Sequence, residues 1–142
     1  MDSVRLTPAQ AEFLAGRHFA TLATLDEDGA PRQAVIWYRL EADGRLLLNS
    51  RHPRRWPRNL QRDERVAIAI LDVDNGLRWL GFTGVVDEVV DDVAQAREDI
   101  MALAYRYSTD GTVDAETEAI FRSQQRITFL VRITGVHDHL AG

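Results

Sequence analysis

The sequence predicts a mainly β fold, an antiparallel barrel with peripheral helices, in a single domain that covers residues 1–142. Short runs of apolar and β-branched residues recur along the chain, and tight-turn residues separate them. Helical patterns come mainly late in the chain, so the early strands can pair as antiparallel neighbours. A chain of 142 residues fits one domain, and it contains no internal repeat or low-complexity segment.

Six strands account for the apolar runs. The run at 31–40 alternates along the chain but carries large apolar groups on both faces. The run at 65–71 (RVAIAIL) is nearly continuous, as in a strand buried on both sides. Turn residues at 26–29 and 43–44 predict that the first three strands form an antiparallel meander. The expected strands cover residues 19–25, 31–40, 45–50, 65–71, 77–88 and 127–136.

The first helix has the clearest start signal. Thr7 is a capping residue, Pro8 takes the first helical position and Gln10 completes a capping box, so a helix is expected to about Gly16. A longer helix opens at Asp91 and carries apolar residues at helical spacing near its end. The other helices are expected at 53–61 and 114–123.

Composition excludes several classes of function. The chain has no cysteine, which excludes disulfides, thiolate metal sites and cysteine nucleophiles. All 17 basic residues are arginine, so no lysine is available for Schiff-base chemistry. The net charge of −5 would repel polyanions, and no nucleic-acid partner is expected, although a basic helix is the feature that would favour one.

Targeting and catalytic motifs are also absent from the sequence. The N-terminus lacks the basic-then-apolar order of a secretory signal, and no apolar run reaches the length of a membrane span, so a cytoplasmic protein is expected. There is no GxSxG, GxGxxG, P-loop or HExxH pattern, and no catalytic residue is assigned. His137 and His139 face the same way on the final strand, but two ligands do not make a catalytic zinc site, so no metal site is predicted.

A cluster of arginines follows the third strand in this otherwise acidic chain. A guanidinium matches the oxygens of a phosphate in pairs, and a helix that begins near Pro53 adds oriented N–H groups. Asn49 and Ser50, at the preceding strand end, supply neutral donors. The alternative is a solvated helix face that pairs with Asp63 and Glu64. The six arginines are Arg51, Arg54, Arg55, Arg58, Arg62 and Arg65.

Apolar groups on both faces of several strands favour self-association. A closed barrel of this size would leave some of Trp37, Trp79 and Phe82 facing water. A second copy of the chain would cover them, and two-fold dimers are the commonest oligomers, so a homodimer is expected.

Four segments together carry a family resemblance: FATLATLDEDGAPRQAVIWYRL, RLLLNS, HPRRWPRNLQRDERVAI and GLRWLGFTGVV. Their order resembles that of the split β-barrel flavin and deazaflavin proteins, the pyridoxamine 5′-phosphate oxidase-like family, over residues 6–138. The most specific part is the RNL-x-RD-x-RV block from Arg58 to Val66. The chain is most similar to the branch of oxidoreductases that depend on the deazaflavin coenzyme F420.

The resemblance implies a six-stranded split barrel, a homodimer and two cofactor sites at its interface. The cofactor ring would lie against the second strand, and its phosphate would meet the strand-to-helix segment. Trp56 stands where many relatives have a phosphate-binding lysine, so a neighbouring arginine would supply that charge. Trp79 would approach from the partner subunit. The implied ring contacts are Ala34, Val35, Ile36 and Trp37, and the implied phosphate contacts are Asn49, Ser50, Arg54, Arg55 and Asn59.

The implied activity is hydride transfer between F420 and a small, conjugated organic substrate, with FMN as the alternative cofactor. An arginine track through Arg51, Arg58 and Arg62 favours F420, because F420 continues past its phosphate into a glutamate tail. A protein that only binds a cofactor or haem is the non-enzymatic alternative. Pyridoxamine phosphate oxidases proper are longer and end in a basic substrate-binding motif, whereas this chain ends in VRITGVHDHLAG, so that specific activity is not expected.

Overall fold

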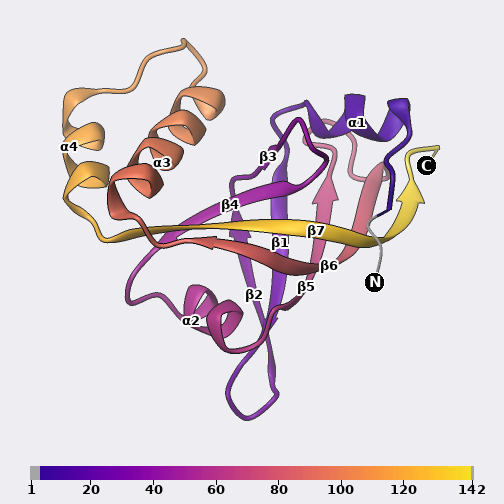
Figure 1. Ribbon diagram of the computed structural model, residues 1–142. Helices are drawn as coiled ribbons and strands as arrows, with labels where there is room; N and C mark the ends of the chain where they lie inside the picture. The colour runs from indigo at the N-terminus through magenta and orange to yellow at the C-terminus, as the bar shows by residue number, and fades with distance from the viewer. Residues whose placement is uncertain (1–3, 142) are drawn as a thin grey trace.

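The computed structural model describes residues 4–141 as one curled antiparallel sheet with helices around it (Figure 1). The strand order β2-β1-β5-β6-β7-β4-β3 confirms the mainly β, split-barrel prediction. The strands are β1 (Phe19–Leu25), β2 (Pro31–Ile36), β3 (Arg39–Leu40), β4 (Leu46–Arg51), β5 (Arg65–Leu71), β6 (Trp79–Val90) and β7 (Arg126–His139). The helices are α1 (Pro8–Leu14), α2 (Arg55–Arg62), α3 (Val93–Tyr107) and α4 (Ala115–Ser123).

The expected single strand at 31–40 is two strands, which raises the described sheet from six strands to seven. β2 pairs with β1, whereas β3 pairs with β4 at the other end of the strand order. Between them Tyr38 is fully buried, and its hydroxyl donates to the backbone oxygen of Leu14 at 2.9 Å. Because the chain crosses from one end of the sheet to the other at Trp37 and Tyr38, the barrel is split there.

β4 separates two apolar cores, because successive side chains of a strand point to opposite faces. Leu46 and Leu48 point into the barrel, where they join the main core. Leu47 points the other way and packs with Ile100 of α3 and Leu130 of β7 in a smaller core. The pair α3 and α4 therefore packs on the outside of β4 and β7 through a separate, smaller apolar core.

β5 is buried on one face only, so the expectation of burial on both faces is wrong for the single chain. In the described chain α3 packs mainly against β7 and β4, α2 against β1 and β2, and α1 against β3. None of these helices covers the outside of β5. We call the uncovered outside of β1, β2, β5 and β6 the outer face. The buried positions of β5 are Val66, Ile68 and Ile70, and the exposed positions are Arg65, Ala67, Ala69 and Leu71.

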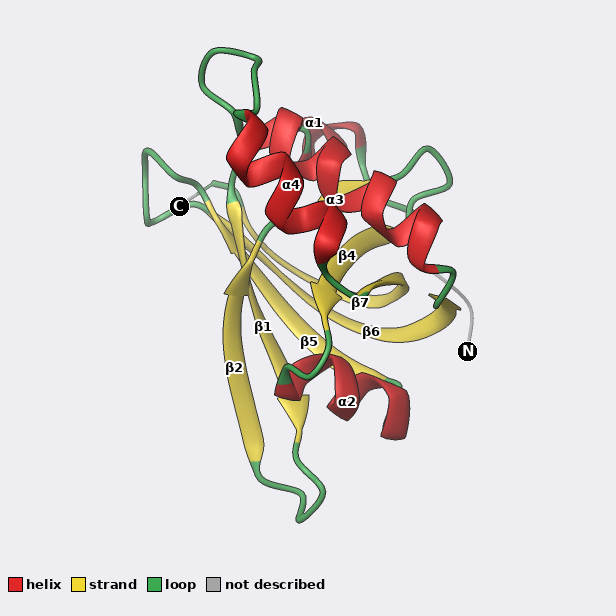
Figure 2. Cartoon of the chain, turned by 90° about the vertical axis from the view of Figure 1, so that its left-hand side faces the viewer, coloured by secondary structure: helices red, strands yellow, loops and turns green. Residues whose placement is uncertain are grey.

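The helices occupy three places around the sheet. The capping box of Thr7 and Gln10 is present at α1, as expected. Below the sheet, α2 closes one end of the barrel, while α3 and α4 lie together across its open side (Figure 2). Trp56 and Leu60 of α2 belong to the main core. No described helix combines the length and apolar character needed to cross a membrane.

Candidate cofactor-binding cleft

A cleft of about 380 Å³ lies at the split, between β2 on one side and β4, α3 and α4 on the other. We call it the split cleft. The two ends of the sheet do not pair with each other in the described chain, and α3 and α4 lie over the opening between them (Figure 2). The split cleft is lined by Phe19, Val35, Ile36, Trp37, Asn49, Arg54, Ile100, Leu103, Phe121, Gln124 and Arg126.

One end of the split cleft is aromatic. Trp37 stacks on Tyr107 of α3, with ring centroids 5.1 Å apart and planes 8° apart. Phe121 of α4 meets Trp37 edge-on at 6.5 Å, and Phe19 stacks on the other ring of the pair, Tyr107, at 5.6 Å. A wall of flat rings beside Ile100 favours contact with a planar apolar ligand.

The other end of the split cleft is positively charged. Arg126, the first residue of β7, is only 4% exposed. Its guanidinium donates to two neutral acceptors, Asn49 Oδ1 at 3.0 and 2.8 Å and Gln124 Oε1 at 2.6 Å. Arg54 lines the same end, and among residues 4–141 neither arginine forms an ion pair with an acidic side chain. A ligand that carries an anionic group would neutralise this end.

The pKa values of these arginines reflect that unbalanced charge. Burial lowers the pKa of Arg126 to about 10, and repulsion from Arg54 and Arg51 adds to the effect. Burial and then Arg51 also lower the pKa of Arg54. Arg54 is moreover the N-cap residue of α2, where no described side chain caps the first N–H groups. The charged end of the split cleft is therefore built from Arg126 and Arg54, and α2 begins directly after Arg54.

Three of the four expected ring contacts line the split cleft. Val35, Ile36 and Trp37 do so, and the side chain of Val35 is 70% exposed. Ala34 instead packs against the main core, because it lies on the inner face of β2. The structure thus brings the second half of β2 to the cleft and keeps Ala34 behind it.

The expected neutral donors lie on opposite faces of β4. Asn49 lines the split cleft and is paired with protein groups through both its amide nitrogen and its oxygen. Ser50 points the other way, into the barrel, beside its cross-strand partner Ile127. Its hydroxyl is fully buried and has no hydrogen-bond partner among the described residues. Asn49 and Ser50 side chains therefore do not face one common ligand.

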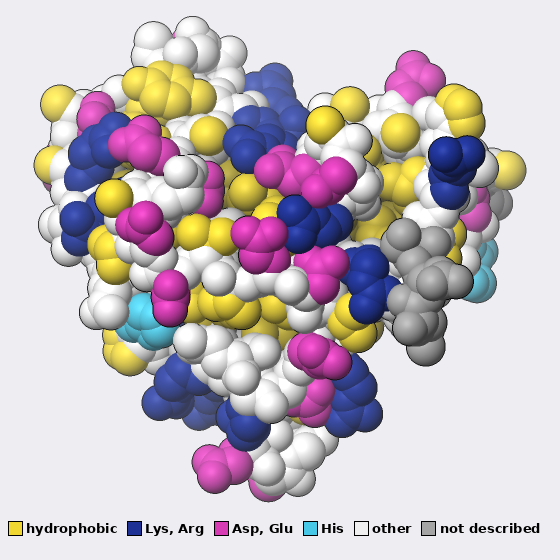
Figure 3. Space-filling view, in the orientation of Figure 1, with side chains coloured by type: hydrophobic (Ala, Val, Ile, Leu, Met, Phe, Trp, Pro, Cys, Tyr) yellow, Lys and Arg dark blue, Asp and Glu magenta, His cyan; other side chains and the backbone are white. Residues whose placement is uncertain are grey.

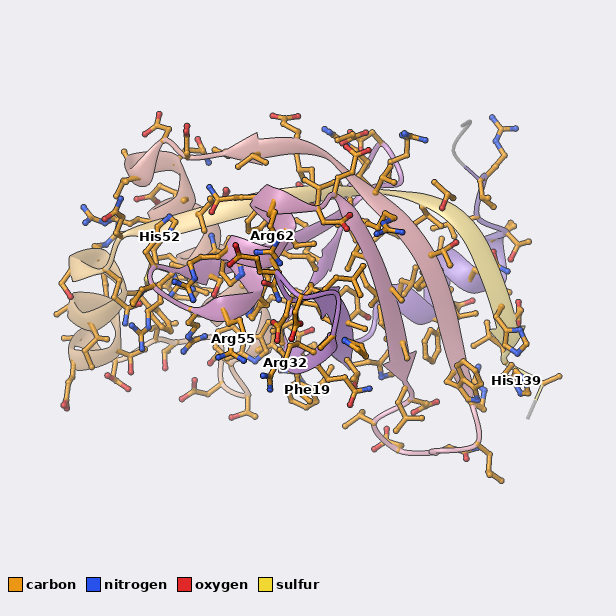
Figure 4. The ribbon with its side chains drawn as sticks, turned by 90° about the horizontal axis from the view of Figure 1, so that it is seen from below. Phe19, Arg32, His52, Arg55, Arg62 and His139 are labelled. Atoms are coloured by element: carbon orange, nitrogen blue, oxygen red, sulfur yellow. The ribbon has the colours of Figure 1, made fainter. Side chains whose placement is uncertain are left out.

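Arg54 and Arg55 also line different cavities. Arg55 lies 3.6 Å from Asp26, in a separate groove between α2 and the β1–β2 hairpin. Asn59 is used within that groove, where its amide nitrogen donates to Thr24 at 3.1 Å and to Asp26 at 3.0 Å. Figure 4 shows Arg55 close to Arg32 at this end of the molecule, with Arg62 nearby. We call this place the hairpin groove, and it is lined by Asp26, Glu27, Asp28, Arg32, Arg55, Arg58, Asn59 and Arg62.

The two tryptophans outside the split cleft have different surroundings. Trp56 is buried and packs against Phe129 in the main core, so its position does not present a side chain to the cleft. Trp79 lies on the outer face and stacks on His139 at 4.6 Å, with His137 alongside at 5.2 Å. Among the described residues no three metal-type side chains gather around this pair or elsewhere.

A family model described as pyridoxamine 5′-phosphate oxidase matches residues 6–137. The chain belongs to this family. The match spans the whole sheet except the last two residues of β7, and therefore both walls of the split cleft. No curated protein matches the sequence.

Several solved structures have a similar fold. An F420 reductase has a TM-score of 0.75 and 24% identity, over 93% of this chain and 98% of that protein. A conserved hypothetical protein of Mycobacterium tuberculosis has a TM-score of 0.73 and 25% identity, over 97% and 88%. The haem storage protein HutZ of Vibrio cholerae has a TM-score of 0.69 and 22% identity, over 95% of each chain. At these identities the likeness establishes the fold.

Arg126 is the charged cleft residue that sequence reasoning missed, and the cleft residues Phe19, Ile100, Leu103, Phe121 and Gln124 were not predicted either. Arg126 stands 61 to 75 positions after the arginine cluster, and only the register that pairs Arg51 with Arg126 brings it there. The available signal was the alternation of side chains along β7. Arg126 and Thr128 are two residues apart, so their side chains lie on the same face of the strand. The solvated-face alternative holds for the end of the cluster, where Arg65 pairs with Asp63 at 2.8 Å.

Proposed function

We propose that the protein is an oxidoreductase that binds coenzyme F420, with FMN as the alternative, in the split cleft. The observation that carries this proposal is the cleft's two-ended chemistry. An aromatic wall built on Trp37 adjoins a buried arginine that has no acidic partner among the described residues. A flavin-type cofactor has the same two parts, a flat ring system and a phosphate.

The chain's residues would bind and orient rather than take part covalently. The bound cofactor would supply hydride transfer, which asks the protein mainly for position and a water-poor setting. Trp37, Ile100 and Leu103 supply the apolar surface for the ring, and Arg54 the charge for the phosphate. The substrate class proposed is a small, conjugated organic molecule, because such a molecule can lie against the exposed side of the ring.

The preference for F420 rests on fewer arginines than the sequence suggested. Arg51 is the cross-strand partner of Arg126 and so lies beside the charged end of the cleft, where its charge lowers the pKa of both Arg54 and Arg126. Arg58 instead lines the hairpin groove, and Arg62 bonds there to Asn59 and to the backbone of Leu25. Arg51 is therefore the residue that supports a cofactor with charge beyond its phosphate.

A homodimer formed through the outer face is part of the proposal. Strands β1 and β5 expose Phe19 at 46% and Leu71 at 49%, and Val35 beside the cleft is more exposed still. Small side chains such as Ala69 and Gly81 lie between these larger groups and would let a second sheet approach closely. Because Val35 belongs to both the outer face and the split cleft, a second copy would also cover the exposed side of the cofactor.

The cofactor assignment is tested by titrating the purified protein with F420 and with FMN while following fluorescence. We expect saturable binding of F420, with FMN weaker. Tight FMN binding without F420 binding would replace F420 by FMN, and binding of neither would overturn the proposal. Turnover of a conjugated substrate with reduced cofactor separates an enzyme from a protein that stores a cofactor or haem.

Two neighbouring arginines provide a matched pair of variants. Arg54→Ala should weaken cofactor binding by about tenfold or more, because hydrogen bonds to charged groups are worth about 1.5 to 3 kcal/mol. Arg55→Ala removes the same side chain one residue later, in the hairpin groove, and binding should stay within about twofold of wild type. Equal losses in both variants would place the phosphate elsewhere.

A further inference from the structure

A chain of buried hydrogen bonds runs from Arg126 across the sheet to α3. Arg126 donates through two nitrogens to Asn49 Oδ1, and Asn49 Nδ2 donates to Thr128 Oγ1 at 2.8 Å. Thr128 Oγ1 then donates to Asp99 Oδ2 at 2.7 Å. All four residues are buried, at 4%, 6%, 1% and 9% exposure respectively. We call this set the relay.

Every hydrogen in the relay points the same way, from the guanidinium toward the carboxylate. Donors and acceptors that are aligned in this manner polarise one another, which strengthens each bond in a low-dielectric interior. The amide of Asn49 is further fixed because its nitrogen also donates to the backbone oxygen of Ala96 at 2.9 Å. The second carboxylate oxygen of Asp99 accepts from Gln95 at 3.0 Å. Each member therefore has one orientation that satisfies its neighbours.

The relay holds Arg126 in place without neutralising it at close range. Asp99 reaches the guanidinium only through two neutral side chains, so no carboxylate touches the charge. The guanidinium also lies over the ring of Phe121 at 5.4 Å. It has more N–H groups than its three bonds to Asn49 and Gln124 use, and it lines the split cleft. Burying a guanidinium that no carboxylate contacts costs free energy, and an anion that binds to it would offset this cost.

We propose that Arg126 is the anion-recognition residue at the floor of the split cleft and that Thr128 and Asp99 are its positioning residues. The ligand group is a phosphate ester, which accepts from two arginines at once, here Arg126 and Arg54. This inference rests on the proposed function, since it assigns the anionic end of the same ligand. A relay with a structural role only would affect folding but would not affect discrimination between phosphorylated and unphosphorylated ligands.

The test compares FMN with riboflavin, which has the same ring system and lacks the phosphate. Dissociation constants come from fluorescence titrations of wild type and Arg126→Gln. The variant should lose about tenfold or more in FMN affinity while its riboflavin affinity stays within about threefold, because only the phosphate contact is removed. Arg58→Gln, the same substitution in the hairpin groove, should leave both affinities unchanged.

The positioning role needs a readout that stability alone would not move. Thr128→Val removes the hydroxyl that joins Asn49 to Asp99 and keeps the size of the side chain. It should lower the ratio of FMN to riboflavin affinity by about threefold or more, and Thr128→Ser should restore that ratio. Far-UV circular dichroism at the titration temperature confirms that each variant compared is folded.

The outcomes separate this inference from the proposed function. If wild type binds neither FMN nor F420, the cofactor proposal fails. If wild type prefers FMN to riboflavin and Arg126→Gln keeps that preference, the cofactor proposal stands and Arg126 is not the anion-recognition residue. Should Arg126→Gln not fold, Arg126→Met is used, because methionine is a long unbranched side chain without charge. A full wild-type preference in that variant would equally overturn the inference.

Discussion

Arg106 joins the last turn of α3 to the end of α1. Its guanidinium donates to the backbone oxygens of Leu14 at 3.2 Å, Gly16 at 2.8 Å and Tyr38 at 3.0 Å, and to that of Ala15 at 3.2 Å. The bonds to Leu14, Ala15 and Gly16 satisfy carbonyl groups at the end of α1, which the helix itself leaves without partners. Arg106 thus adds a polar anchor to the apolar packing of α3, which forms one wall of the split cleft.

Replacing the guanidinium of Arg106 should destabilise the fold even when the positive charge is kept. Arg106→Lys is expected to lower the free energy of unfolding by about 1 to 3 kcal/mol, since lysine cannot reach several carbonyls in a plane. Urea denaturation measures the change. Arg17→Lys is the control, because Arg17 makes one exposed bond to the backbone of Ser108, and its effect should be much smaller. Similar losses in both variants would contradict the anchoring role of Arg106.

Asp26 makes the hairpin groove sensitive to acid. The hydrogen bond from Arg32, followed by that from Asn59, lowers the pKa of Asp26 below its usual value of 3.8. A lowered folded-state pKa means that the ionised carboxylate stabilises the fold above about pH 3.8, and that this stability is lost as the pH falls through the lowered value.

The lowered pKa of Asp26 predicts how the stability of Asp26→Asn changes with pH. Wild type should melt at a higher temperature than the variant at pH 6, and the difference should shrink as the pH falls below 3.8. Thermal melts at a series of pH values measure it. Glu27→Gln, on the same hairpin, is the comparison. A difference for Asp26→Asn that stayed constant down to pH 2 would show that the carboxylate gains nothing from these contacts.

The register of the long strands β6 and β7 shifts by one residue between Thr83 and Gly84. A Cβ atom at Gly84 would lie 2.6 Å from Val131 Cγ1 and 2.9 Å from the backbone oxygen of Arg132. Because the second neighbour is backbone, the clash cannot be relieved by a side-chain rotation. Gly84→Ala should therefore lower the free energy of unfolding by about 1 to 3 kcal/mol.

A matched glycine substitution isolates the steric cause. A Cβ atom at Gly76, in the turn between β5 and β6, would meet no atom within 4 Å. Gly76→Ala should thus leave the denaturation midpoint nearly unchanged, whereas Gly84→Ala moves it to lower denaturant. An unchanged midpoint in both variants would mean that β6 and β7 separate there at little cost.

Local patterns were enough to predict most elements of the fold. The capping box of Thr7 and Gln10 located α1, apolar and β-branched runs located β1 and β5, and alternation located β7, each within a few residues. The break at Tyr38 was beyond reach, because its alternation continues through 31–40 and only the tertiary contact with α1 turns the chain. The two-sided burial expected for β5 failed for a related reason, since its alanines read as apolar although no helix covers them.

The candidate site was predictable only in part, because a phosphate site depends on directions that sequence spacing does not give. Arg54 and Arg55 are adjacent in the chain, yet they line different hollows. Asn59 looked like a phosphate ligand and is engaged with Thr24 in the hairpin groove. The position of Arg126 in the cleft could not be predicted, because it depends on which strands are neighbours, and that is a long-range property of the sheet.

A cluster of arginines and the apolar outer face lie in different parts of the molecule. Arginines gather around α2 and the β1–β2 hairpin, and dark blue side chains flank that lower lobe in Figure 3. The outer face, by contrast, presents a row in which Val35, Thr21, Ala69 and Gly81 are cross-strand neighbours. The outer face is therefore the surface suited to a second copy of the chain, while the arginine-rich end also carries Asp26, Glu27 and Asp28.

A charge placed in the middle of that row should prevent association. Ala69 is exposed in the single chain, so Ala69→Arg is expected to fold normally but to behave as a monomer in sedimentation-velocity experiments, where wild type should be a dimer. Cofactor affinity should fall together with the dimer, because Val35 connects the outer face to the split cleft.

Ala115→Arg introduces the same charge at the exposed first residue of α4, away from the outer face, and should remain dimeric. If both variants stay dimeric, the copies meet through another surface. If Ala69→Arg is monomeric yet binds the cofactor as tightly as wild type does, the split cleft is complete within one chain. That result would confine the second copy to covering the apolar outer face, and the charged end built on Arg54 and Arg126 would then account for cofactor binding by itself.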